Sequence, residues 1–334
     1  MANVTERERA RRREPVRRRR LVALACVVLV AAMAALVVGA RVGAGRTPSS
    51  FAVGLRTIVL VDRTRSISLP DGTTVPRTLV TYVRYPAHGS ARGIDRRGAP
   101  AARSDGPFPL VVFGHGFAVT PAQYARLLDS WARAGYVVAA PVFPVENANA
   151  PGGPDRSDVI NQPADMRFVI SRLLRANAAA SGPLAGLIDP QHIAVAGQSD
   201  GGETALAVAY DSQERDPRVG AAVILSGAEM PGLGGLSFPA GSPPLLAAQG
   251  TADTLNLPSN TSAFLDAASR PKYLLSLLGA GHLPPYSDQQ PQLRVVEATT
   301  IAFLDAYLEQ RPESLQRLAS LGSVPGIATL RAEP

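Results

Sequence analysis

The sequence predicts an α/β fold in which a mostly parallel central sheet carries helices on both faces. From residue 51 onward, short β-branched apolar runs alternate with longer segments whose apolar residues recur at helical spacing. The chain has no internal repeat, and its single cysteine, Cys26, lies outside this region, so a disulfide framework is excluded. Sheets of this architecture place their sites at the carboxyl ends of the strands.

The expected elements follow one another without long gaps. An antiparallel strand pair opens the fold, and Pro121 marks the first turn of the first helix. The region 88–107, rich in Gly, Arg, Ala and Pro, is expected to form a surface loop. The predicted strands are 53–61, 78–85, 110–113, 136–140, 193–196, 219–225, 245–249 and 273–278, and the predicted helices are 121–134, 163–176, 201–210, 259–268 and 293–308.

The net charge of +7 comes almost entirely from the N-terminus. Residues 1–20 contain nine Arg and three Glu, and the remaining 314 residues carry only +1. This charge is a local feature and predicts no basic face on the folded domain. No nucleic-acid-binding motif is present, and we expect no nucleic-acid partner.

Residues 21–40 are apolar and uncharged, and they directly follow the Arg cluster 17–20. A helix of this length rises about 30 Å, enough to cross a bilayer core. The flanking Arg residues favour a single-pass anchor at the cell membrane, with the rest of the chain outside the cytoplasm. The alternative is a signal peptide cleaved after the small residues 38–40, which would give a secreted protein. The expected organisation is a basic cytoplasmic tail (1–20), an anchor or signal peptide (21–40), a linker (41–50), a globular domain (51–312) and a C-terminal tail (313–334).

The strongest motif is Gly197-Gln198-Ser199-Asp200-Gly201, which lies between a predicted strand and a predicted helix. This is the context of the G-x-S-x-G nucleophile elbow. Gly197 and Gly201 are expected because larger side chains would clash across so sharp a turn. The helix N-terminus favours negative charge developing near Ser199. The carboxylates of Asp200 and Glu203 either face this site or cap and flank the helix.

A second glycine-rich motif follows the strand 110–113. In Gly114-His115-Gly116-Phe117 we expect a loop that supplies one backbone N–H of an oxyanion hole, from Phe117. The N–H of Asp200 would supply the other. Gly114 and Gly116 permit the tight loop, and His115 is expected to order it rather than to act as a base.

Two further residues complete a set typical of nucleophilic catalysis. Asp253 follows the strand 245–249, and His282 follows the strand 273–278 in the sequence Gly279-Ala280-Gly281-His282. The chain order Ser199, Asp253, His282 is the order Ser…Asp…His of one hydrolase fold. His282 would act as base and Asp253 would orient it. Glu229 is the alternative acid.

These motifs together resemble the α/β-hydrolase superfamily over roughly residues 51–310. The nearest branch contains dienelactone-hydrolase-like proteins, platelet-activating-factor acetylhydrolases, chlorophyllases and bacterial polyester-cleaving cutinases. The resemblance also rests on the segments 53–57, 61–62, 83–87, 135–141 and 165–167. It implies an α/β-hydrolase domain and a lining role for Phe117 in an acyl pocket. Dienelactone hydrolases use a cysteine nucleophile, so that particular activity is not expected here.

The resulting hypothesis is a serine esterase, lipase-like in its chemistry, that acts through an acyl-enzyme. Segment 228–243 is too short for a helical lid, so we expect an open cleft suited to small or polymeric esters. The alternatives are a serine peptidase on the same fold and a non-catalytic cell-envelope protein. No His pair has metal-ligand spacing, and Ser-His-Asp chemistry requires no metal or organic cofactor.

Overall fold

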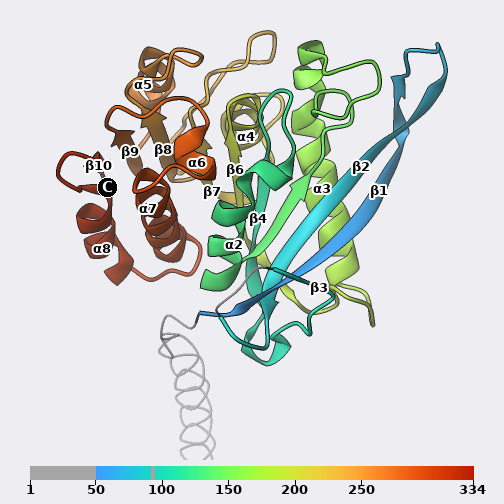
Figure 1. Cartoon of the computed structure of the whole chain (residues 1–334), viewed down its shortest axis with the longest axis horizontal. Coiled ribbons are helices and arrows are strands. Elements are labelled where there is room, and N and C mark those ends of the chain that lie inside the picture. The colour runs from blue at the N-terminus through green and yellow to red at the C-terminus, as the bar shows by residue number, and fades with distance from the viewer. Residues whose placement is uncertain (1–49, 92–94) are drawn as a thin grey trace, which may run out of the picture. The chain divides into compact units, whose positions relative to one another are not determined.

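The computed structural model describes residues 50–91 and 95–334, so the predicted basic tail and membrane span lie outside the described residues. The compact unit comprises Ser49–Pro334. Within it the strands form one sheet in the order β10-β9-β8-β7-β6-β4-β5-β2-β1-β3 (Figure 1). The strands are β1 (Ala52–Ser68), β2 (Thr74–Ala87), β3 (Arg96–Arg97), β4 (Phe108–Gly114), β5 (Val137–Pro141), β6 (Ile188–Gln198), β7 (Val219–Leu225), β8 (Leu245–Gly250), β9 (Lys272–Leu277) and β10 (Ala328–Glu333).

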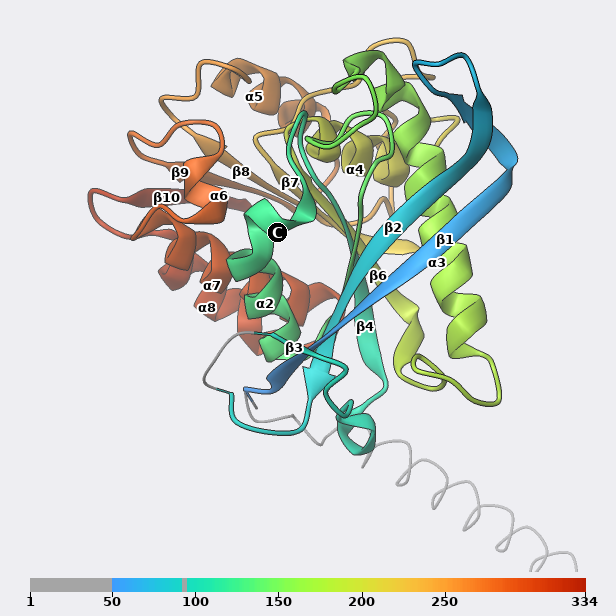
Figure 2. The same cartoon turned by 45° about the vertical axis from the view of Figure 1, so that its right-hand side comes forward.

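The centre of the sheet is parallel and its edges are mixed. Strands β5, β4, β6, β7, β8 and β9 pair in parallel. Strands β1 and β2 form a long antiparallel hairpin (Figure 2). Strand β2 of this hairpin pairs antiparallel with β5. The predicted fold class, a mostly parallel sheet between helices, is therefore confirmed.

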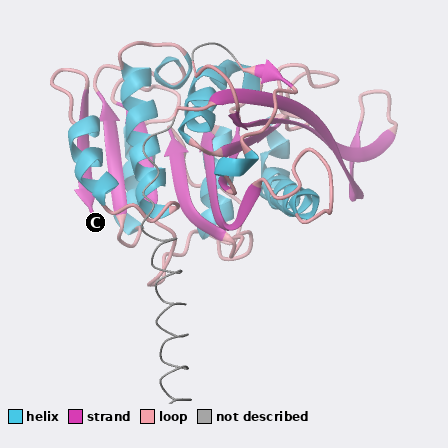
Figure 3. Ribbon diagram, turned by 90° about the horizontal axis from the view of Figure 1, so that it is seen from below, coloured by secondary structure: helices cyan, strands magenta, loops and turns pink. Residues whose placement is uncertain are grey.

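Helices cover both faces of the sheet (Figure 3). Their apolar residues, together with alternate residues of the central strands, form two cores. The helices are η1 (Arg103–Asp105), η2 (Pro121–Tyr124), α2 (Ala125–Ala134), η3 (Arg156–Asn161), α3 (Gln162–Asn177), α4 (Asp200–Tyr210), α5 (Pro258–Ala267), α6 (Pro284–Ser287), α7 (Gln292–Tyr307) and α8 (Glu313–Gly322). In β4, Leu110 and Val112 join the core under α3, α4 and α5, whereas Val111 and Phe113 join the core under α2 and α7.

The predicted C-terminal tail is wrong. Residues 313–334 form α8 and β10, and β10 pairs antiparallel with β9 from Ala328 to Glu333. Leu318 of α8 and Ala328 of β10 are buried in the core beneath α7. The domain therefore extends to the end of the described chain.

Two other features bear on the predictions. Segment 228–243 contains no helix, as expected. Among the described residues, no helix combines the length and apolar character needed to cross a membrane.

Candidate active site

Ser199 lies at a sharp turn between β6 and α4, where its backbone adopts φ 56° and ψ −125°. This left-handed conformation is strained for a non-glycine residue. A Cβ atom at Gly197 would overlap the carbonyl of Gly201, and one at Gly201 would overlap the backbone of Gly114. The two glycines are therefore required by close backbone approach. The turn is held by the Ser199 N–H, which donates to the Leu225 carbonyl at 3.0 Å.

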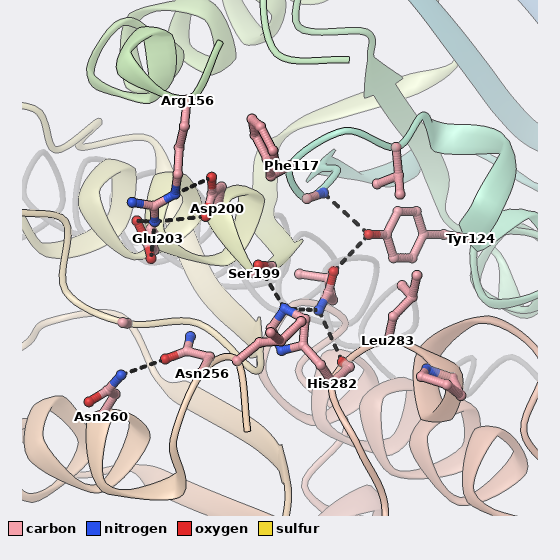
Figure 4. A pocket seen from close by; sticks show the side chains of 16 residues that line it. Phe117, Tyr124, Arg156, Ser199, Asp200, Glu203, Asn256, Asn260, His282 and Leu283 are labelled. Atoms are coloured by element: carbon pink, nitrogen blue, oxygen red, sulfur yellow. Dashed lines mark hydrogen bonds and ion pairs between the residues drawn. The ribbon is translucent and has the colours of Figure 1, made fainter. Parts of the chain in front are cut away.

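Three residues that are far apart in the chain meet at this turn. The Nε2 atom of His282 lies 2.8 Å from Ser199 Oγ (Figure 4). The Nδ1 atom of His282 lies 2.7 Å from Asp253 Oδ2. The side chain of His282 is 14% exposed and that of Asp253 is fully buried. The parallel strands β6, β8 and β9 end at the same edge of the sheet, and this common end is what brings the three side chains together.

Asp253 is held as an ionised carboxylate by several donors. Its Oδ1 accepts from the N–H groups of Leu255 and Asn256, both at 3.0 Å. Burial opposes ionisation, but the hydrogen bonds from His282 and Asn256 outweigh it and keep the pKa of Asp253 below its usual value. The alternative acid Glu229 is exposed, and among the described residues its carboxylate accepts only from the Leu236 N–H, at 3.4 Å. Asp253 is thus the carboxylate that contacts His282.

The loop after β4 contains one backbone N–H that has no acceptor among the described residues. The N–H of Gly116 donates to the Tyr124 hydroxyl at 3.2 Å, and the N–H of Ala118 donates to the Glu146 carbonyl at 3.0 Å. Between them, the N–H of Phe117 has no acceptor among the described residues, and neither does the N–H of Asp200 at the start of α4. Both predicted oxyanion-hole donors are therefore available to a ligand.

His115 is buried beneath this loop and does not contact His282. Its Nδ1 donates to the Gly116 carbonyl at 2.8 Å, and its Nε2 accepts from the Phe143 N–H at 3.0 Å. Burial lowers the pKa of His115 to about 4, so the ring is neutral at neutral pH. These contacts join the loop after β4 to the segment after β5.

A hydrogen-bonded chain that the sequence motifs did not predict links this loop to His282. The Tyr124 hydroxyl donates to Gln198 Oε1 at 2.7 Å, and Gln198 Nε2 donates to the His282 carbonyl at 3.1 Å. The same amide nitrogen lies 3.3 Å from His282 Nε2. At one end of this series of hydrogen bonds the Gly116 N–H can only donate, and at the other end the His282 carbonyl can only accept. The direction of every hydrogen bond between them is therefore fixed.

The site opens into a pocket of about 690 Å³. Phe117, 40% exposed, and Leu255, 79% exposed, are the exposed apolar residues of its lining. On another wall the carboxylates of Asp200 and Glu203 are bound by Arg156 of η3. The remaining lining residues are Gly116, Val119, Tyr124, Gln198, Ser199, Ala228, Asn256, Asn260, His282, Leu283 and Pro284.

Within the described ranges, no group of three or more His, Cys, Asp or Glu side chains is arranged to hold a metal ion. The site as described consists of a hydroxyl, an imidazole, a carboxylate and two free backbone donors. Such an arrangement can activate a hydroxyl and stabilise an oxyanion.

Comparisons with known proteins agree with this fold. The family model described as chlorophyllase matches residues 99–229, which include β4, the loop after it and the elbow at Ser199. No curated protein matches the chain. Among solved structures, a ferulic acid esterase from Streptomyces cinnamoneus has the same fold, with a TM-score of 0.57 and 23% sequence identity over 81% of this chain and 93% of that chain.

The sheet order, the strand–elbow–helix at Ser199, the match to the chlorophyllase family model and the shared fold of the solved esterase lead to one conclusion. The chain has the α/β-hydrolase fold, and its residues 99–229 are similar to the chlorophyllase family.

Proposed function

We propose that this protein is a serine carboxylic-ester hydrolase. The observation that carries the proposal is the position of His282, which bridges Ser199 at 2.8 Å and Asp253 at 2.7 Å. The similarity of residues 99–229 to the chlorophyllase family and the fold shared with a solved protein named as a ferulic acid esterase support ester hydrolysis.

In the proposed first step, His282 Nε2 accepts the Ser199 proton as Oγ attacks the ester carbonyl carbon. The bond from Oγ to carbon forms, and the carbonyl π electrons move to oxygen. The N–H groups of Phe117 and Asp200 bind the resulting oxyanion. Asp253 holds Nδ1–H and stabilises the imidazolium.

Collapse of this intermediate expels the alcohol. His282 Nε2 donates its proton to the departing oxygen, and the acyl group remains on Ser199. Water then attacks the acyl-enzyme with His282 again as base, which releases the carboxylic acid and restores the serine. The open pocket, with Phe117 and Leu255 exposed in its lining, suits small esters or ester groups within a polymer.

A panel of p-nitrophenyl esters of rising acyl length tests this proposal. The wild type should turn over at least one ester, and Ser199→Ala should lose activity by about 10⁴-fold or more. A peptide p-nitroanilide panel run in parallel separates esterase from peptidase activity. Turnover of peptides alone would replace esterase with peptidase, and turnover of neither would contradict a hydrolase.

We also propose that residues 21–40 anchor the protein in the cell membrane, with the hydrolase domain outside the cytoplasm. This rests on the uncharged apolar run after the Arg cluster. In cells that express the full chain, the protein should remain in the membrane pellet after extraction with alkaline carbonate. Recovery of a shortened chain in the medium would instead indicate cleavage and secretion.

A further inference from the structure

The wall of the pocket next to Ser199 is formed by an ion cluster across two elements (Figure 4). Arg156 of η3 donates from Nε and Nη2 to the two oxygens of Asp200, each at 2.9 Å. Its Nη2 also reaches both oxygens of Glu203, at 3.1 and 3.2 Å. A single guanidinium therefore binds both carboxylates of the first turn of α4.

The carboxylates of this cluster are buried and the guanidinium covers them. The side chains of Asp200 and Glu203 are 4% and 8% exposed, whereas that of Arg156 is 54% exposed. A third acid, Glu146, is fully buried beside Asp200. Burial is the larger cause and the neighbouring Asp200 carboxylate the smaller cause that raise the pKa of Glu146 to about 10. Glu146 is thus neutral at neutral pH, and the charges to be balanced are that of Asp200 and, at pH values above its raised pKa of about 7, that of Glu203.

These carboxylates lie next to the donor that the proposed reaction uses. The N–H of Asp200 is one of the two groups that would bind the oxyanion, so the side chain of the same residue brings a negative charge close to a developing negative charge. Glu203 lies one turn further along the helix. In a partly desolvated site, like charges a few ångströms apart repel strongly. Without a compensating cation, this wall of the pocket would oppose the transition state.

The position of Arg156 is fixed by the fold. Its neighbour Asp158 receives two hydrogen bonds from the buried Arg77 of β2, at 2.8 and 2.6 Å. Arg77 also binds Asp165 of α3, and the Asp155 carboxylate caps η3 by accepting from the Ser157 N–H at 2.9 Å. The cation is therefore held in place before any substrate binds, as effective electrostatic stabilisation requires.

We propose that Arg156 is a positioning residue that neutralises Asp200 and Glu203 so that the oxyanion can form beside them. The inference rests on the proposed esterase function and deepens it. Arg156 acts through the carboxylates of α4 and forms no bond with the reacting atoms.

The test is a double-mutant cycle on the full chain with the best p-nitrophenyl ester from the panel. Arg156→Met should lower kcat by about 10- to 100-fold with little change in KM, because the repulsion arises in the transition state. In the Asp200→Asn background, the same Arg156→Met change should cost less than about 3-fold, since one of the unbalanced charges is gone. Arg175→Met, which removes an exposed charge from α3, is the matched control and should leave kcat unchanged.

A second variant separates charge from folding. Arg156→Gln keeps amide donors for the carboxylates but removes the charge, and it should show a loss similar to that of Arg156→Met. A wild-type kcat in Arg156→Met, or equal losses in both backgrounds, would overturn the inference while leaving the esterase intact. A wild-type enzyme without ester turnover would overturn the proposed function itself, and the inference with it.

Discussion

The side-chain amide of Gln198 donates to the main-chain carbonyl of His282 at 3.1 Å. Gln198 is the residue immediately before the proposed nucleophile, Ser199. The other end of this amide accepts from Tyr124, which in turn accepts from the Gly116 N–H. The loop that carries the base and the loop that carries an oxyanion donor are thereby joined through two buried side chains.

Gln198→Met, which is similar in length but lacks these donors and acceptors, is expected to lower kcat by about 10-fold by loosening His282. Tyr124→Phe should have a comparable effect. Because both act on one network, the double variant should lose little more than either single variant, as measured by steady-state ester hydrolysis. Gln191→Met, at the exposed start of β6, is the control. Fully additive losses would show that the two side chains act independently.

Asp253→Asn is expected to lower kcat by about 10⁴-fold while the fold is retained. The amide cannot stabilise the imidazolium and favours the wrong tautomer of His282. Glu229→Gln should change kcat by less than about 2-fold, because the Glu229 carboxylate accepts a hydrogen bond from the Leu236 N–H and does not contact His282. The reverse ranking in steady-state kinetics would make Glu229 the acid.

Arg77→Met is expected to lower the free energy of unfolding by about 3–5 kcal/mol. The substitution leaves Asp158 buried without the cation that binds it and leaves Asp165 with only Arg65 as an ion-pair partner among the described residues. Urea denaturation monitored by circular dichroism measures the change. Arg331→Met removes an ion pair whose two side chains are 47% and 65% exposed, and it should leave the free energy of unfolding nearly unchanged. Equal effects of the two substitutions would contradict this account of the buried cluster.

Glu146→Gln is expected to stabilise the protein in a pH-dependent way. The folded-state pKa of Glu146 is raised from 4.5 to about 10, so above pH 4.5 the unfolded state releases a proton that the folded state keeps. The contribution of Glu146 to the free energy of unfolding of the wild type is therefore largest below pH 4.5. It decreases as the pH rises, by at most about 1.4 kcal/mol per pH unit.

Glutamine does not titrate, so the advantage of Glu146→Gln in free energy of unfolding should grow between pH 4 and pH 8. Burial also raises the pKa of Glu203, to about 7. Its effect on the free energy of unfolding has the same sign in the wild type and in Glu146→Gln, so it largely cancels in the difference between the two proteins. Urea denaturation at a series of pH values provides the test. A difference that does not change with pH would show that Glu146 is ionised in the folded state.

The parallel core of the fold could be predicted from the sequence because each central strand is an apolar run flanked by glycine-rich or polar turns. The same pattern placed Ser199, Asp253 and His282 after successive strands, and a parallel sheet brings such positions to one edge. The strand–helix context of the elbow also accounts for Gly197 and Gly201, because larger side chains would clash across so sharp a turn.

Other features depend on contacts that a sequence pattern does not contain. Strand β10 lies at the edge of the sheet and is half exposed, so its sequence Ala-Thr-Leu-Arg-Ala-Glu lacks the apolar run of a central strand. The bond between Tyr124 and Gln198 joins residues 74 positions apart. Arg156 lies 44 positions before Asp200, and nothing in the spacing of the two residues indicates an ion pair.

The most direct test of the central claim is covalent labelling of the full chain with a fluorophosphonate, followed by peptide mapping. A serine activated by His282 should react, and the adduct should map to Ser199. His282→Ala should label far more slowly, and Ser199→Ala should not label. Equal labelling of the wild type and Ser199→Ala, or an adduct mapped to another residue, would contradict the account.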